Sequence, residues 1–163
     1  MAGYGFAVAG GHLFIWLLMR TLWESVRETG VTKQKPHREE HREFPMMLGI
    51  LERSLYVAAW QFGKPEFMGV WLALKVAGQW KAWGEDIVGR DRIILGRAIF
   101  NVFLIGNGLS ISYGVVGALI IDWWGKGLKL PLTVVPLMLV IVNVVFWLWA
   151  KWHLARRHRF ISN

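Results

Sequence analysis

Residues 48–60 read "LGILERSLYVAAW", an apolar run of helical length in which Glu52 and Arg53 stand side by side. A charge inside a membrane segment costs about 2.5–3.5 kcal/mol on insertion scales, so such charges are usually paired and often functional. Whether this run lies in lipid or in the interior of a soluble protein therefore decides the fold.

The composition favours lipid. Of the 163 residues, 55% are hydrophobic and 11 are Trp, and most of these Trp residues, Trp71 among them, cluster toward the ends of apolar runs, where the indole ring prefers the headgroup boundary. The chain has no Cys, which excludes disulfides, thiolate nucleophiles and Cys-ligated zinc. The basic residues behind the net charge of +8 lie between the apolar runs, so membrane topology and anionic lipid explain them. We expect no nucleic-acid partner.

Five apolar segments approach the roughly 20 residues that cross a bilayer. The first basic residue, Arg20, comes after the first apolar run, whereas a secretory signal peptide needs positive charge before it, so we expect this segment to stay as a helix. The second and third segments are short and carry ionisable residues, so tilted or re-entrant segments are the alternative. The predicted fold is all-α: an integral membrane helical bundle of about five transmembrane helices in one multi-pass domain, residues 1–163. Its helices are 4–23, 46–62, 67–83, 98–123 and 131–152, and its polar cytoplasmic loop is 24–45.

The distribution of basic residues predicts the orientation. Cytoplasmic loops near helix ends are rich in Lys and Arg. One side of the five-span arrangement collects 14 basic residues, whereas the other has three. The 14 fall in 20–42, 81–97 and 151–159, and the three are Lys64, Lys126 and Lys129. We therefore expect five spans with the N-terminus outside and the C-terminus inside. The expected location is a bacterial inner membrane.

A hairpin brings Glu52 a candidate partner. The second and third helices are antiparallel around the turn at 63–66, and counting outward from its middle places Glu52 about two residues from Lys75. Arg53 has a side chain long enough to snorkel to the interface, whereas Glu52 needs a counter-charge. Asn107 and Asn143 lie at about the same depth in the fourth and fifth helices. These residues form either an intramembrane polar layer that binds an ion, a proton or a headgroup, or a set of interhelical hydrogen bonds that only stabilises the bundle.

Histidines offer two further hypotheses. "HREEH" at 37–41 matches the H-x-x-E-H zinc-protease signature through His37, Glu40 and His41, but a solvated juxtamembrane helix of alternating charge explains it better. His12, after "GG" at 10–11, is a possible pigment or haem ligand, although a hydrogen-bonded role inside the bundle is favoured. We predict no metal and no bound cofactor.

Small residues mark one face of the fourth helix, where Gly106, Ser110, Gly114 and Gly117 follow each other at roughly four-residue spacing. Such a face lets two helix backbones approach closely. It contacts either another subunit or the protein's own helices, and the sequence leaves both alternatives open.

Residues 48–118 resemble an uncharacterised bacterial family of small multi-pass membrane proteins, a domain of unknown function. The resemblance lies in "GILERSL" at 49–55, "GVWLALK" at 69–75 and "FLIGNGLS" at 103–110. It implies that Glu52, Arg53 and Lys75 belong to a recurring hairpin, and it implies no reaction.

The sequence thus favours a structural or accessory subunit of a larger membrane assembly over an enzyme. Its expected partners are membrane lipids, anionic on the cytoplasmic face, and another membrane protein or a second copy of itself. The alternative is a small transporter, channel or membrane effector that uses the Glu52–Lys75 polar layer.

Overall fold

The structure is a computed structural model that describes residues 2–28, 43–84 and 90–161. Within these ranges all regular elements are helices, which confirms the all-α prediction. They are α1 (Ala2–Gly5), the π-helical η1 (Phe6–Gly10), α2 (Gly11–Glu28), α3 (Glu43–Gln61), α4 (Glu66–Gly84), α5 (Arg90–Gly125) and α6 (Lys129–Ile161). Most of the predicted loop 24–45, including 37–41, lies outside the described residues.

Three helical stretches in the described part of the chain are long and apolar enough to cross a membrane: Ala2–Glu24, Ala98–Gly125 and Lys129–His153. They correspond to the first, fourth and fifth predicted spans and indicate a membrane protein. The second and third predicted spans are also present as helices, α3 and α4, each of 19 residues.

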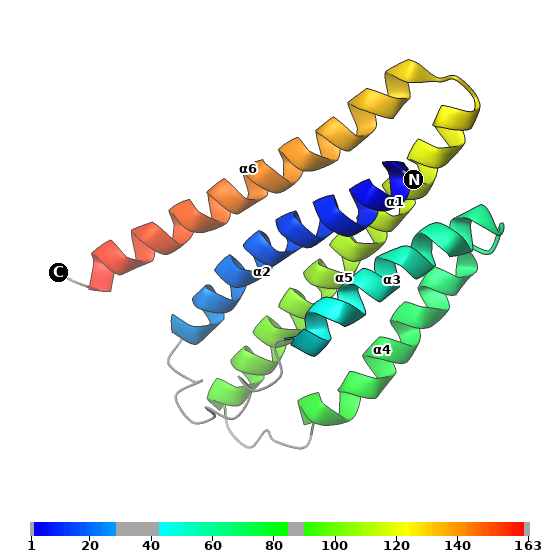
Figure 1. The fold of residues 1–163 in the computed structure, drawn as a ribbon. Helices are drawn as coiled ribbons and strands as arrows, with labels where there is room; N and C mark the ends of the chain where they lie inside the picture. The colour runs from blue at the N-terminus through cyan, green and yellow to red at the C-terminus, as the bar shows by residue number, and fades with distance from the viewer. Residues whose placement is uncertain (1, 29–42, 85–89, 162–163) are drawn as a thin grey trace.

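Helix α5 is the centre of the bundle. It packs against α1, η1 and α2, against α3, and against α6, whereas α4 packs lightly against α3 and α5. Figure 1 shows the result: α6 and α4 lie at the two outer edges, with α2, α3 and α5 between them. A buried hydrophobic cluster of the core lies where Ala7, Val57 and Ala118 meet, with Trp60 and Ile121 packed against them.

Two glycines close the connections at the outer end of the predicted topology. Gly63 has φ 66° and Gly127 has φ 69°, a left-handed conformation that glycine adopts without steric cost. The amide of Lys64 donates to the carbonyl of Ala59 at 2.8 Å, and the amide of Leu128 donates to that of Trp123 at 2.9 Å. Both are six-residue Schellman closures, which end α3 and α5 sharply.

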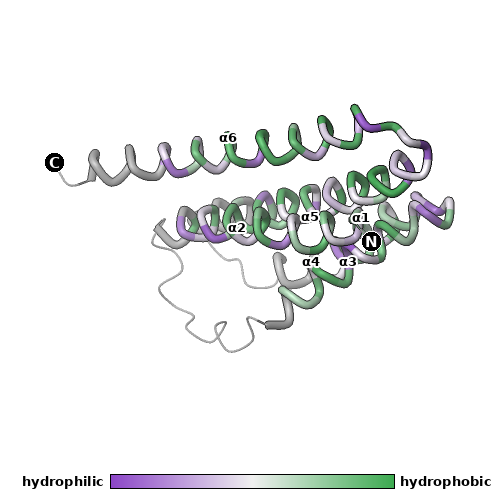
Figure 2. The backbone as a smooth tube through the Cα atoms, turned by 45° about the horizontal axis from the view of Figure 1, so that its top comes forward, coloured by the Kyte–Doolittle hydropathy of each residue, from purple (hydrophilic) through white to green (hydrophobic). Residues whose placement is uncertain are grey.

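Helix α6 is the least enclosed of the long helices. Between Lys129 and His153 only Asn143 and Ala150 are buried, and apolar side chains cover its other faces. Figure 2 shows α6 standing apart at one edge, with hydrophobic residues along most of its coloured length. A helix that is apolar all round needs lipid or another protein as its surroundings.

Candidate functional site

A charged cluster joins α3, α4 and α5 through the side chain of Lys75. Its Nζ lies 2.7 Å from Oε1 of Glu52 and donates a hydrogen bond to Oδ1 of Asn107 at 2.5 Å. The contact that the hairpin register predicts is therefore present, and Asn107 of the predicted layer joins it. We call Glu52, Lys75 and Asn107, with the indole of Trp71, the polar cluster.

The helix geometry explains why Trp71 belongs to this cluster. Trp71 and Lys75 are four residues apart on α4, so their side chains lie on one face. The indole Nε1 donates to Oε1 of Glu52 at 3.2 Å, so that oxygen accepts from two donors. The placement of Trp71 among the interfacial tryptophans missed this role. The i, i+4 spacing with Lys75 was the signal that could have found it.

The cluster is enclosed. Glu52 is 3% exposed and Asn107 6%, whereas the side chain of Lys75 keeps 20% of its surface. The Asn107 amide nitrogen donates to the carbonyl of Phe103 at 2.7 Å, so both ends of this amide are used and its orientation is fixed. The arrangement holds a carboxylate and an ammonium in direct contact away from water, which is costly unless both keep their partners.

Arg53 is buried in the bundle. Its side chain is long enough to snorkel to the interface, but it is only 3% exposed and stays among the helices. A Cβ atom added to Gly11 would lie 2.9 Å from Cδ of Arg53, and one added to Gly49 would lie 3.3 Å from its Nη1. The side chain thus lies between two glycines, one on α2 and one a turn earlier on α3. Its Nε and Nη2 have no hydrogen-bond partner.

Asn143 stands apart from the polar cluster. Its amide nitrogen donates to the carbonyl of Leu139 in its own helix at 2.7 Å, and its Oδ1 is buried without a partner. One turn further along α6, the indole of Trp147 donates to Oγ1 of Thr21 at 3.2 Å and fastens α6 to α2. The structure therefore connects three of the predicted layer residues, Glu52, Lys75 and Asn107, and leaves Asn143 outside the hydrogen-bonded group.

The small-residue face of α5 contacts the protein's own helices. A Cβ atom on Gly114 would lie 2.6 Å from Cβ of Tyr56, and one on Gly117 would lie 2.7 Å from Cβ of Ala7. Gly106 meets the end of the Met19 side chain at 3.2 Å, and Ser110 is 4% exposed. Of the two alternatives left open by the sequence, the internal contact is the one in the structure.

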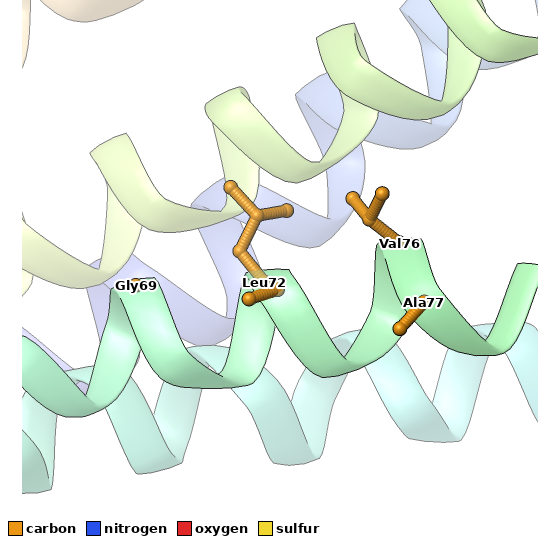
Figure 3. A pocket seen from close by; sticks show the side chains of 5 residues that line it. Gly69, Leu72, Val76 and Ala77 are labelled. Carbon is orange, nitrogen blue, oxygen red and sulfur yellow. The ribbon is translucent and has the colours of Figure 1, made fainter. Parts of the chain in front are cut away.

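A second small-residue face lies on α4 and is open. Gly69, Ala73 and Ala77 follow each other at four-residue spacing and are exposed. With Leu72 and Val76 they line an open groove of about 680 Å³. Figure 3 shows Leu72 and Val76 pointing from α4 toward the yellow-green ribbon of α5, while Ala77 points away from α5. Sequence reasoning missed this face because it considered the glycines of α5 alone.

The described residues do not test the two histidine hypotheses, the metal site and the pigment or haem site. His12 is partly buried on α2, and the pigment or haem hypothesis stays a prediction. Within the described residues no group of three or more His, Asp or Glu side chains is placed to hold a metal ion. His37, Glu40 and His41 lie outside those residues.

The fold and the site together define an α-helical chain with membrane-length helices and a buried charged cluster. The chain matches no protein-family model, no curated protein and no solved structure. The resemblance of residues 48–118 to a family of small multi-pass membrane proteins stays a prediction. The function must therefore be argued from the residues of this chain.

Proposed function

We propose that the protein is a five-span bacterial inner membrane protein, N-terminus outside and C-terminus inside, that serves as an accessory subunit of a larger membrane assembly. The faces of α3 and α4 support five spans. Their charged residues Glu52, Arg53 and Lys75 turn inward, whereas Leu51, Val70 and Leu74 are exposed. A 19-residue helix is about 28 Å long, close to the hydrocarbon thickness of about 30 Å.

Cysteine labelling tests this topology, since the chain has no Cys of its own. In spheroplasts, Lys64→Cys and Lys126→Cys should react with a membrane-impermeant maleimide, whereas Lys151→Cys should react only after permeabilisation. Reaction of Lys64→Cys and Lys151→Cys from the same side would contradict the five-span arrangement.

The observation that carries the subunit proposal is the open face of α4. Without a hydrophobic driving force between helices in lipid, small residues matter because they let backbones approach and pack. The comparable face of α5 is filled by the protein's own side chains, whereas a Cβ atom at Gly69 meets nothing within 4 Å. The groove beside Gly69 and Ala73 suits a transmembrane helix of a partner protein, whose side chains would enter it.

Native mass spectrometry from native membranes tests this proposal. We expect a stoichiometric complex with another membrane protein that Ala73→Leu weakens and that Val142→Leu, on the exposed face of α6, leaves intact. A monomer, or a complex equally stable in both variants, would contradict the proposal. A homo-oligomer lost in Ala73→Leu would identify the partner as a second copy.

The polar cluster favours a second candidate function, ion or proton transport by the same chain. Ionisable residues inside membrane segments commonly mark pathways for ions, and the contact of Glu52 with Lys75 and Asn107 places such residues together. Purified protein in liposomes should then conduct an ion in a manner that Lys75→Met abolishes and Lys151→Met preserves. Liposomes as tight as protein-free ones would exclude transport by the chain alone.

Cation–π pairs support binding of anionic lipid at the proposed inner face. The guanidinium of Arg20 lies 5.6 Å from the ring centre of Trp16, and Nζ of Lys151 lies 4.7 Å from that of Trp147. These exposed cations lie near the ends of the membrane-length stretches Ala2–Glu24 and Lys129–His153, where headgroups carry negative charge.

A further inference from the structure

The part of the bundle around Arg53 holds more positive than negative charge. Oε1 of Glu52 forms an ion pair with Nζ of Lys75 at 2.7 Å. In the part of the chain that the structure describes, no carboxylate lies within 4.0 Å of Arg53, although Glu52 is its neighbour in sequence. Asp122 lies near the C-terminal end of α5, where its carboxylate accepts hydrogen bonds from Trp60 and Gln61. Two cations and one carboxylate are thus enclosed together.

Two of the three guanidinium nitrogens of Arg53 lack hydrogen-bond acceptors. Its Nε and Nη2 have no partner, and the residue is 3% exposed. Arginine has five N–H donors and no acceptor, and its guanidinium stays charged under all physiological conditions. A buried charge without a partner costs several kcal/mol, so native structures supply a counter-charge or a bound ion.

The neighbouring side chains offer more donors. Tyr113 meets Arg53 across Gly11, where an added Cβ would lie 3.1 Å from Cβ of Tyr113 and 2.9 Å from Cδ of Arg53. The hydroxyl of Tyr113 is buried and has no partner, and the same holds for Ser110, one turn earlier on α5, and for Tyr56, one turn later than Arg53 on α3. A hydroxyl can turn its hydrogen toward an acceptor. This region therefore combines a net positive charge with donors that lack acceptors.

We propose that Arg53 binds a small inorganic anion, of halide size, inside the helix bundle. The anion neutralises the excess charge and accepts hydrogen bonds from the N–H groups of Nε and Nη2. A halide suits the site better than a phospholipid headgroup because the guanidinium is enclosed by α2, α3 and α5. The proposal does not depend on the accessory-subunit role.

Chloride binding to the purified full-length protein in detergent tests the site directly. Equilibrium dialysis against labelled chloride, with gluconate holding the ionic strength constant, should find one bound chloride per chain. Arg53→Met should weaken this binding about tenfold or more, as expected for the loss of one charge-assisted hydrogen bond. Lys126→Met is the matched control, because Lys126 is an exposed cation between α5 and α6 and its loss should leave chloride binding unchanged.

A structural measurement covers the case in which Arg53→Met does not fold. Crystals of the wild-type protein grown in bromide should show an anomalous peak in hydrogen-bonding contact with Nε or Nη2 of Arg53. The proposal is overturned if no chloride binds, if both variants bind it equally, or if bromide is absent beside Arg53. It is also overturned if the density there belongs to a lipid phosphate.

Discussion

Replacing Lys75 by Met removes the ammonium that holds Glu52 while keeping a side chain of similar length. The change leaves the Glu52 carboxylate buried, with the indole of Trp71 at 3.2 Å as its remaining donor, and it frees Oδ1 of Asn107. Breaking a buried ion pair in this way costs about 3–5 kcal/mol. Because the Lys75 side chain keeps 20% of its surface, the loss should lie near the lower end, about 3 kcal/mol.

The companion change Glu52→Gln separates the charge from the packing. Glutamine keeps the shape and an acceptor for Trp71 but leaves the Lys75 ammonium without its counter-charge. The double variant removes both charges, so it should be less destabilised than the sum of the two single variants by at least about 1 kcal/mol. Lys126→Met, at an exposed position between α5 and α6, is the control and should change the unfolding free energy by less than about 0.5 kcal/mol.

The free energies come from equilibrium unfolding of the purified protein in bicelles by increasing SDS, followed by tryptophan fluorescence. If the two single-variant losses add within about 0.5 kcal/mol, the ion pair makes no energetic contribution and the reasoning about the polar cluster is refuted.

Three further predictions follow from contacts elsewhere in the bundle. Gly114→Ala should destabilise the bundle by about 1–3 kcal/mol in the same unfolding assay, because the added Cβ would lie 2.6 Å from Cβ of Tyr56. Gly108→Ala is the control on the same helix: the added Cβ has open space around it, so the variant should be as stable as the wild type or slightly more stable. Thr21→Val should lower stability by about 0.6 kcal/mol through loss of the Trp147 hydrogen bond, and an unchanged melting temperature would refute that contribution. Asp122→Leu should remove the acceptor of Trp60 and one of the two acceptors of Gln61, leaving Gln61 its hydrogen bond to the carbonyl of Ala118. Hydrogen exchange should then become faster at the C-terminal ends of α3 and α5, and unchanged exchange there would contradict this prediction.

The Glu52–Lys75 contact could be predicted because a short turn fixes the register of two antiparallel helices. The turn between α3 and α4 is closed at Gly63, so the number of residues from the turn gives the position of each residue along the hairpin. Asn107 joined them because helix length also fixes depth along the bundle.

The direction of Arg53 could not be predicted by the same means. Adjacent residues on a helix point about 100° apart, so the face occupied by Glu52 says little about the surroundings of Arg53. These surroundings depend on Gly11, which is 42 positions away in the sequence. Counting residues gives the position of a side chain along the helix, but it does not say which other helix packs against that side of the helix.

The glycines of α5 show a related limit. Their spacing predicts that another backbone comes close, and Tyr56 and Ala7 do so. The spacing alone does not say whether that backbone belongs to the same chain. The answer required the contacts of α3 and of the N-terminal helix, which come from distant parts of the sequence.

The sparse packing of α6 has a consequence for biosynthesis. This helix follows all the others along the chain and buries only Asn143 and Ala150 between Lys129 and His153. The earlier helices can therefore close around α5 before α6 joins them. A chain that ends before Lys129 would then still assemble its central helices.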